Sequence, residues 1–191
     1  MATRTLLRRR LSLLLLPLLV VIVASACAPV KGGPPRGVVL WGDSFGEQVA
    51  PLLPYEEHVF GGTAPCDWLN HMRELAATRP PAVALLLFGE STVTPCTGGS
   101  ITTYPAQAFE AIRVLEAAGT RVFVIGAPCQ PPHKGYEAPA NIAFVNGGVP
   151  VHWGPYSSVC PPGYPTYIQY DGHLNATGVA RFAHEIRVIA G

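Results

Sequence analysis

Charge is scarce in this sequence of 191 residues. Asp, Glu, Lys and Arg make up 13% of it and hydrophobic residues 49%, whereas an ordinary soluble domain has about 25% charged residues. No basic patch or stripe of the kind that binds nucleic acid is visible. The sequence has no internal repeat, and its composition excludes a disordered chain, a collagen-like fibre and a coiled coil.

The few basic residues are unevenly placed. Arg4 and the run Arg8–Arg10 precede residues 11–26, which hold no charge. Without residues 1–26, nine Lys and Arg residues stand against 12 acidic ones, so the net charge changes from +1 to about −3. The 165 residues that remain are enough for one domain with a hydrophobic core.

The first 26 residues have the three parts of a secretory signal peptide. An arginine-rich start is followed by the apolar run Leu11–Val23 and by the small residues Ala24, Ser25 and Ala26. The apolar run is shorter than the roughly 20 residues that a membrane-spanning helix needs. We therefore expect residues 1–26 to be a cleaved signal peptide and the protein to be exported.

Cys27 follows the small residues, and this arrangement resembles a bacterial lipoprotein processing site, whose cysteine becomes the lipidated first residue. The same small residues also suit ordinary signal peptidase, so full secretion is the alternative. We predict that Cys27 is lipidated and that residues 27–36, which are rich in Pro and Gly, form a tether. The lipid would be the protein's sole contact with a membrane, and residues 37–191 would form the domain.

Short apolar segments alternate with helical patterns along this domain. Strands are predicted at Val38–Trp41, His58–Phe60, Ala82–Phe88, Arg121–Gly126 and Val149–Trp153. Helices are predicted at Glu47–Leu53, Asp67–Thr78, Pro105–Ala118, Pro139–Asn146 and Ala176–Ile189. This alternation predicts an α/β fold, a three-layer α/β/α sandwich with a parallel, flavodoxin-like sheet.

Four cysteines follow Cys27, and an even number in an exported chain argues for two disulfides. Their spacing does not resemble a zinc site, so we expect no metal. Loops at the carboxyl ends of parallel strands meet at one edge, where such sheets bind ligands. Of the three possible connectivities, adjacency at this edge favours Cys66–Cys96, which leaves Cys129–Cys160.

Two short motifs carry residues that can perform chemistry together. Gly42-Asp43-Ser44 stands at the end of the first strand, and Asp171 and His173 stand just before the last helix. A serine hydroxyl is a poor nucleophile unless a base removes its proton, and an imidazole held by a carboxylate is the usual solution. The alternative for an isolated triplet of this kind is a polar cap on a turn.

The sequence resembles the SGNH (GDSL-type) hydrolase family over nearly the whole predicted domain. VVLWGDSFG, VFGGTAPC and YDGHLNATG resemble the first, second and last blocks of that family. The resemblance implies that Ser44 is the nucleophile and that Asp171 and His173 complete the triad. It also implies an oxyanion hole formed by the N–H groups of Ser44 and of Gly62, with Gly61 as the alternative, and it implies no cofactor.

The third block of the family is altered here. It normally supplies an asparagine to the oxyanion hole, but in LLFGESTVTPC this position is Glu90. Loss of one such donor typically lowers the rate by ~10²–10³. Ser91, Thr92 or Asn70 could replace the asparagine, or Glu90 could be protonated.

The spacing of the last block also departs from the family. Asp171 stands two residues before His173, and the family pattern has three. The resemblance implies a serine esterase that acts on acyl esters, including O-acyl groups of cell-envelope glycans. The alternatives are a glycan O-acyltransferase and a non-catalytic envelope lipoprotein that binds glycan or a protein partner. The oligomeric state does not follow from the sequence.

Overall fold

The computed structural model describes residues 37–89, 91, 93–160 and 166–191. The expected signal peptide and tether, with Cys27, lie outside the described residues, and so do Glu90 and Thr92. In the described ranges, no helix combines the length and the apolar character that crossing a membrane requires.

A five-stranded sheet forms the centre of the domain, and all of its strand pairs are parallel. The strands are β1 (Val38–Gly42), β2 (Glu56–Val59), β3 (Val83–Leu87), β4 (Arg121–Ile125) and β5 (Val151–His152). Their order, β2-β1-β3-β4-β5, is the flavodoxin-like order expected from the sequence. The second strand starts two residues earlier than predicted, and the fifth is shorter than predicted.

Six α-helices occur in the described part of the domain. They are α3 (Ser44–Val49), α4 (Pro65–Thr78), α5 (Tyr104–Ala117), α6 (Pro139–Gly147), α7 (Gly154–Val159) and α8 (Ala176–Ala190). Four short 3₁₀ turns accompany them: η1 (Ala50–Leu52), η2 (Pro95–Thr97), η3 (Ile101–Thr103) and η4 (Pro132–Lys134).

The helical predictions differ from the structure in two places. The helix expected at Glu47–Leu53 starts three residues earlier, at Ser44, because Asp43 caps it, and its last residues form the 3₁₀ turn η1. Helix α7 was not expected, since its sequence GPYSSV begins with two residues typical of turns.

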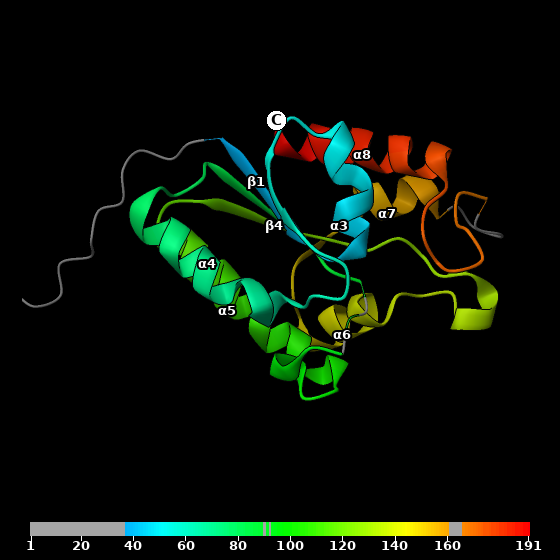
Figure 1. The fold of residues 1–191 in the computed structure, drawn as a ribbon, viewed down its shortest axis with the longest axis horizontal. Helices are drawn as coiled ribbons and strands as arrows, with labels where there is room; N and C mark the ends of the chain where they lie inside the picture. The colour runs from blue at the N-terminus through cyan, green and yellow to red at the C-terminus, as the bar shows by residue number, and fades with distance from the viewer. Residues whose placement is uncertain (1–36, 90, 92, 161–165) are drawn as a thin grey trace, which may run out of the picture. The chain divides into compact units, whose positions relative to one another are not determined.

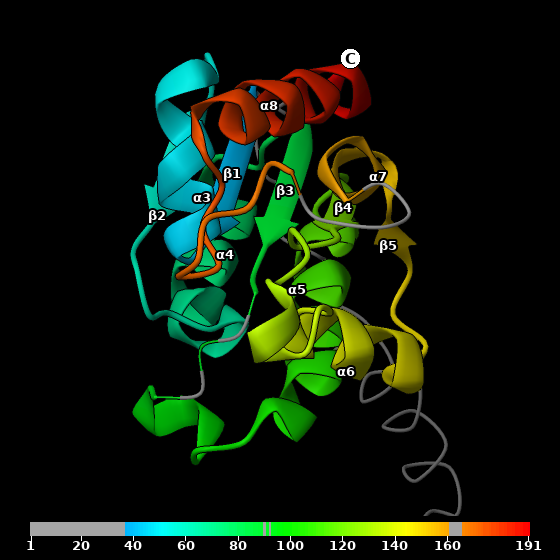
Figure 2. The same ribbon diagram turned by 90° about the vertical axis from the view of Figure 1, so that its right-hand side faces the viewer.

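Helices cover both faces of the sheet (Figures 1 and 2). β3 is buried throughout, and its side chains alternate between two hydrophobic clusters. Leu85 packs in the same cluster as Phe182 and Ile186 of α8, whereas Leu86 packs with Met72 of α4 and Leu115 of α5. The predicted three-layer α/β/α sandwich is therefore confirmed, and the carboxyl ends of β1 and β3 open at one edge of it.

Candidate active site

Ser44 is the first residue of α3 and directly follows the turn that leaves β1. Asp43 fixes this turn, because its Oδ1 accepts a hydrogen bond from the backbone N–H of Phe45 at 3.0 Å. Its Oδ2 accepts another from the N–H of Gly89 at 2.6 Å, and the residue is only 2% exposed. A buried carboxylate thus joins the serine turn to the loop that follows β3.

Close packing explains the glycines on either side of this carboxylate. A Cβ atom on Gly42 would lie 2.6 Å from the carbonyl oxygen of Leu87. A Cβ atom on Gly89 would lie 2.3 Å from the ring of Phe45. Both distances are shorter than real Cβ contacts, so Gly42 can lie this close to β3, and Gly89 this close to the Phe45 ring, only because both residues lack a side chain.

The last block is bound to the helix that carries Ser44. Gln48 Nε2 donates to the carbonyl of Leu174 at 3.3 Å, and the N–H of Leu174 donates to Gln48 Oε1 at 3.1 Å. Gln48 lies one helical turn after Ser44, so the two side chains share a face of α3. His173 precedes Leu174, and its ring centre lies 5.9 Å from that of Phe45. These contacts bring His173 to the first turn of α3, where Ser44 lies.

Asp171 and His173 form a pair despite their short spacing. Asp171 Oδ2 lies 3.2 Å from His173 Nδ1, while Oδ1 accepts from the backbone N–H of His173 at 3.0 Å. A side chain that bonds the N–H two residues later makes a tight turn, and Gly172 between them has a φ of +96°. The aspartate can therefore reach the imidazole from two residues away.

This pair is open to solvent, with the Asp171 side chain 64% exposed and that of His173 37% exposed. The pKa of Asp171 is lowered, first by the hydrogen bond from the backbone N–H of His173 and next by the bond to its side chain. The aspartate is thus held ionised, as a group that orients an imidazole must be.

The second block contributes two glycines beside the serine. A Cβ atom on Gly61 would lie 3.8 Å from Ser44 Cβ, whereas the nearest atom to one on Gly62 belongs to Val93. In the described part of the chain, no acceptor takes the N–H of Ser44 or of either glycine. Gly61 therefore lies near the Ser44 side chain, although the atom nearest to its Cβ position is Glu47 Oε2, at 3.0 Å. The choice of Gly62 stays a prediction.

Two of the residues proposed to replace the family asparagine, Ser91 and Asn70, lie in the described part of the chain. The Ser91 hydroxyl donates to the carbonyl of Gly62, which ties the third block to the second. Asn70 lies on the exposed face of α4, where its oxygen accepts from Arg73 Nη1 at 2.9 Å, so its side chain is bonded within that helix rather than at the site. Glu90 and Thr92, outside the described residues, stay predictions.

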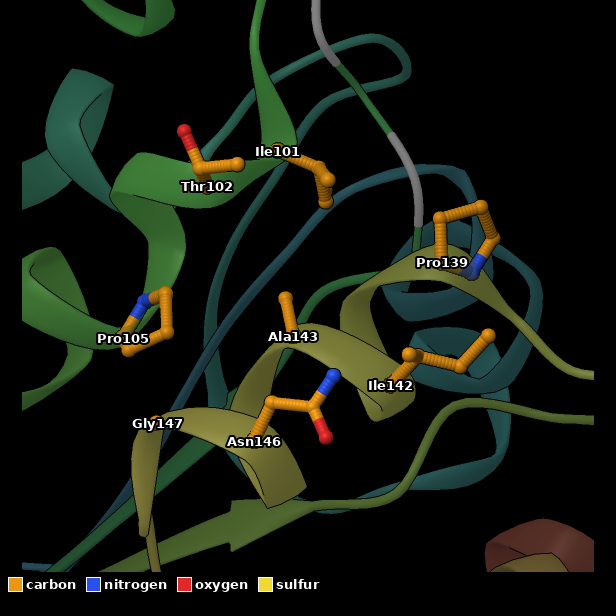
Figure 3. A pocket seen from close by; sticks show the side chains of 8 residues that line it. All are labelled: Ile101, Thr102, Pro105, Pro139, Ile142, Ala143, Asn146 and Gly147. Atoms are coloured by element: carbon orange, nitrogen blue, oxygen red, sulfur yellow. The ribbon is translucent and has the colours of Figure 1, made fainter.

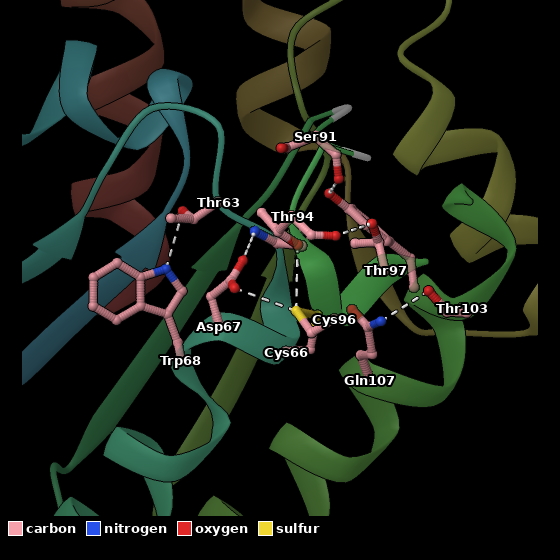
Figure 4. The surroundings of a disulfide bond; sticks show 12 residues. Thr63, Cys66, Asp67, Trp68, Ser91, Thr94, Cys96, Thr97, Thr103 and Gln107 are labelled. Carbon is pink, nitrogen blue, oxygen red and sulfur yellow. Dashed lines mark hydrogen bonds between the residues drawn. A yellow bond between two sulfur atoms is a disulfide. The ribbon is translucent and has the colours of Figure 1, made fainter. Parts of the chain in front are cut away.

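The structure contains the disulfides Cys66–Cys96 and Cys129–Cys160, which is the pairing expected from the edge of the sheet. Figure 4 shows that Cys66–Cys96 joins the start of α4 to η2, beside Asp67. These three side chains are close enough to hold a metal ion, but both sulfurs are in the disulfide, which leaves one carboxylate. That donor set does not fit a zinc site, which needs three or four ligands.

An apolar hollow of about 420 Å³ lies between η3, the start of α5 and α6 (Figure 3). Ile101, Pro139 and Ile142 are among the residues that line it. None of the predicted catalytic residues lines it. We place the candidate active site by its side chains and not by this hollow, because a serine, a histidine and a carboxylate are what the chemistry requires.

Three residues at or near the site were not assigned a role from the sequence. Asp43 belongs to the GDS motif, and its position before a helix is a signal for an N-cap. Gln48 and Lys134 meet the last block across 126 and 37 residues of sequence, respectively. Contacts over such separations leave no local pattern in a single sequence.

No protein-family model matches the sequence, and no curated protein matches it either. The fold, in contrast, is shared with many solved structures. A GDSL-like lipase from Bacteroides thetaiotaomicron is 15% identical with a TM-score of 0.60, covering 89% of this chain and 94% of that one.

Two further structures are similar. The lipase/acylhydrolase from Enterococcus faecalis is 19% identical with a TM-score of 0.54, over 82% of this chain and 96% of that one. A carbohydrate esterase family 3 protein from Talaromyces cellulolyticus is 15% identical with a TM-score of 0.54, over 81% and 96%. The domain described here therefore has the fold of the GDSL-type (SGNH) hydrolases.

Proposed function

We propose that this protein is a serine esterase of the SGNH type that hydrolyses acyl esters. One observation carries the proposal: the paired bonds between Gln48 and Leu174 bring the Asp171–His173 pair to the first turn of α3, which begins with Ser44. In this proposal Ser44 is the nucleophile, His173 is the base and Asp171 orients the base, at the strand edge where this class of sheet binds ligands.

The chemistry follows from these positions. Ser44 attacks the acyl carbonyl, and His173 takes the serine proton and later gives it to the leaving alcohol. Asp171 holds the imidazole in the required tautomer. The N–H of Ser44, at the start of a helix, and a glycine N–H of the second block stabilise the oxyanion. Water then releases the acyl group from Ser44.

We further propose that the substrates are O-acyl groups of cell-envelope glycans and that the protein is exported and anchored through a lipid on Cys27. A carbohydrate esterase among the structural neighbours supports the proposal of a glycan substrate. The two disulfides support export, because disulfides persist in oxidising compartments. A sugar hydroxyl in place of water as the acceptor would make the same site an acyltransferase.

Fluorophosphonate labelling of the purified protein tests the proposal without a guess at the substrate. We expect the wild type to be labelled at one serine and the Ser44→Ala variant to show no label. Ser100→Ala, which removes a different serine from a 3₁₀ N-cap, is the matched control and retains labelling. A folded wild-type protein with both disulfides intact that takes no label would instead indicate a domain that binds a glycan or a protein partner.

A further inference from the structure

The loop between β4 and α6 packs against the turn that carries Asp171 and His173. Its Lys134 Nζ donates to the backbone carbonyl of Asp171 at 2.6 Å. The same ammonium lies 3.3 Å from the position that a Cβ atom on Gly172 would take. A cation from another part of the chain therefore contacts the backbone of the turn that carries the predicted catalytic pair.

Two other residues of this loop contact the same turn. A Cβ atom on Gly172 would lie 2.4 Å from Gln130 Oε1. Gln130 is 1% exposed, and neither polar atom of its side chain has a partner in the described residues, so it packs against the turn without bonding it. The ring of His133 stacks on that of Tyr170, with centres 4.2 Å apart.

The loop is itself held in place. The N–H of Gln130 donates to the carbonyl of Tyr136 at 2.7 Å, and the N–H of Lys134 donates to that of Pro131 at 2.8 Å. Cys129, which precedes Gln130, is buried and bonded to Cys160. Lys134 therefore extends from a braced loop, so its bond to Asp171 does not have to order the loop backbone as well.

The Asp171–His173 turn needs such support. The Asp171 side chain is exposed, so water competes for its oxygens, and it is one residue closer to the histidine than the family pattern sets. Among the described residues, the hydrogen bonds of its carboxylate go to His173, within its own turn. The lysine bond is therefore a tie from outside the turn to the carboxylate residue itself.

We propose that Lys134 is a positioning residue, which holds the Asp171–His173 turn against α3 so that the imidazole stays aligned with Ser44. This inference rests on the proposed esterase function. The ammonium is also one of the charges that lower the pKa of Asp171, after the bonds and the charge of His173. Because an arginine can reach the same carbonyl with the same charge, only loss of the cation should misplace the turn.

Kinetics of the purified variants on p-nitrophenyl acetate provide the test. We expect Lys134→Met to lower kcat about tenfold and to leave KM within about twofold, since misplacement of a catalytic group slows the chemical step. Lys134→Arg should retain kcat within about threefold. Arg113→Met removes an exposed cation from α5 that pairs with Glu110, and it controls for the loss of a surface charge.

A second measurement does not depend on turnover. The backbone N–H of His173 donates to Asp171, and hydrogen exchange measured by NMR reports how long that turn stays closed. We expect this N–H to exchange several times faster in Lys134→Met than in the wild type or in Lys134→Arg. Circular dichroism and thermal unfolding verify that each variant is folded.

The outcomes separate the two proposals. If the wild type neither takes up fluorophosphonate nor hydrolyses the ester, the esterase function fails, and exchange of the His173 N–H alone decides whether Lys134 holds the turn. If the wild type is active and Lys134→Met matches it in kcat and in exchange, the role of Lys134 is refuted. A loss of kcat that Lys134→Arg does not recover also refutes it.

Discussion

The two turns that meet at the candidate site are built in opposite ways. The serine turn surrounds a carboxylate, Asp43, that is 2% exposed and accepts backbone N–H bonds from two separate segments. The base turn carries a carboxylate, Asp171, that is 64% exposed and bonds within its own turn. The same residue type thus maintains the architecture in one turn and is available for chemistry in the other. The serine turn is therefore fixed by its own carboxylate, whereas the base turn is fixed from outside, by Gln48 and Lys134.

Replacing each aspartate by alanine gives the largest difference between the turns. Asp43→Ala leaves the N–H groups of Phe45 and Gly89 buried without their acceptor, and each such loss costs about 1–3 kcal/mol. We expect it to lower the free energy of unfolding by about 4 kcal/mol in urea titrations. Asp171→Ala, at an exposed position, should leave it nearly unchanged.

For variants that stay folded, we expect the order to be reversed when labelling is measured instead of stability. Asp171→Ala is expected to lower the rate of fluorophosphonate labelling strongly while leaving stability unchanged. Equal losses of stability in the two alanine variants would show that the serine turn does not depend on its buried carboxylate, which would remove the contrast.

The two disulfides provide the second comparison, because one lies beside the second and third blocks and the other lies behind the base turn. They close loops of nearly equal length, with sequence separations of 30 and 31 residues, so chain entropy predicts a similar stabilisation of about 3.5 kcal/mol for each. Their surroundings differ, because Cys129 is fully buried behind the base turn whereas Cys96 is exposed beside the second and third blocks.

We therefore expect replacement of either cysteine pair by alanines to lower the free energy of unfolding by a similar amount. In the wild type, however, we expect the two disulfides to be reduced one after the other. Under limiting dithiothreitol in native buffer, Cys66–Cys96 should open first, because a thiolate must reach a sulfur to attack it. Alkylation followed by peptide mass analysis measures the order. Simultaneous opening would indicate that the loop behind the base turn opens as readily as the exposed one.

Replacing one glycine beside each turn by alanine should have a smaller effect on stability. Gly89→Ala places a methyl group 2.3 Å from the Phe45 ring in a packed core, and such overpacking costs about 1–3 kcal/mol. Gly172→Ala meets the flexible end of Gln130, so its cost comes mainly from a φ of +96° and should be about 1 kcal/mol. Urea unfolding of both variants measures the difference, and a larger loss at residue 172 would contradict it.

The sequence predicts the sheet well because burial leaves a local signature. Five consecutive apolar residues in β3 are typical of a strand buried on both faces, and the alternation of strands and helices predicts a parallel sheet, for which the flavodoxin-like order was the expectation. Helix α7 was missed because Gly154 and Pro155 look like a turn until packing against α8 stabilises the segment. The start of α3 was misplaced because its cap is itself part of the motif.

The residues of the candidate site also differ in whether the sequence reveals them. Ser44, Asp171 and His173 lie in short blocks that a single sequence displays, and their roles stay predictions that labelling will test. The residues that hold these blocks together do not show such patterns. Gln48 reaches Leu174 through a side-chain amide, and Lys134 reaches Asp171 through a backbone carbonyl that every residue type would offer. A contact to backbone places no demand on the partner's identity, so the sequence contains no trace of it.

Acid gives the smallest predicted effect, and it concerns β2, which leads to the glycines beside Ser44. Hydrogen bonds from Arg79 are the main reason why the pKa of Glu56 falls from 4.5 to about 2. A carboxyl group with a lowered folded-state pKa stabilises the fold above its unfolded value, and this stabilisation is lost as pH falls from about 4.5 through about 2.

The Arg79 side chain is 47% exposed, so the pair is screened and should contribute about 0.5–1 kcal/mol. We expect Glu56→Gln to unfold more easily than the wild type by this amount at pH 7 and by almost nothing at pH 2. Asp171→Asn should show a weaker dependence of the same sign, because that carboxylate is more exposed and bonds a neighbour in its own turn. A stronger acid dependence at Asp171 than at Glu56 would mean that the base turn, and not the β2 edge, depends on its charge for stability.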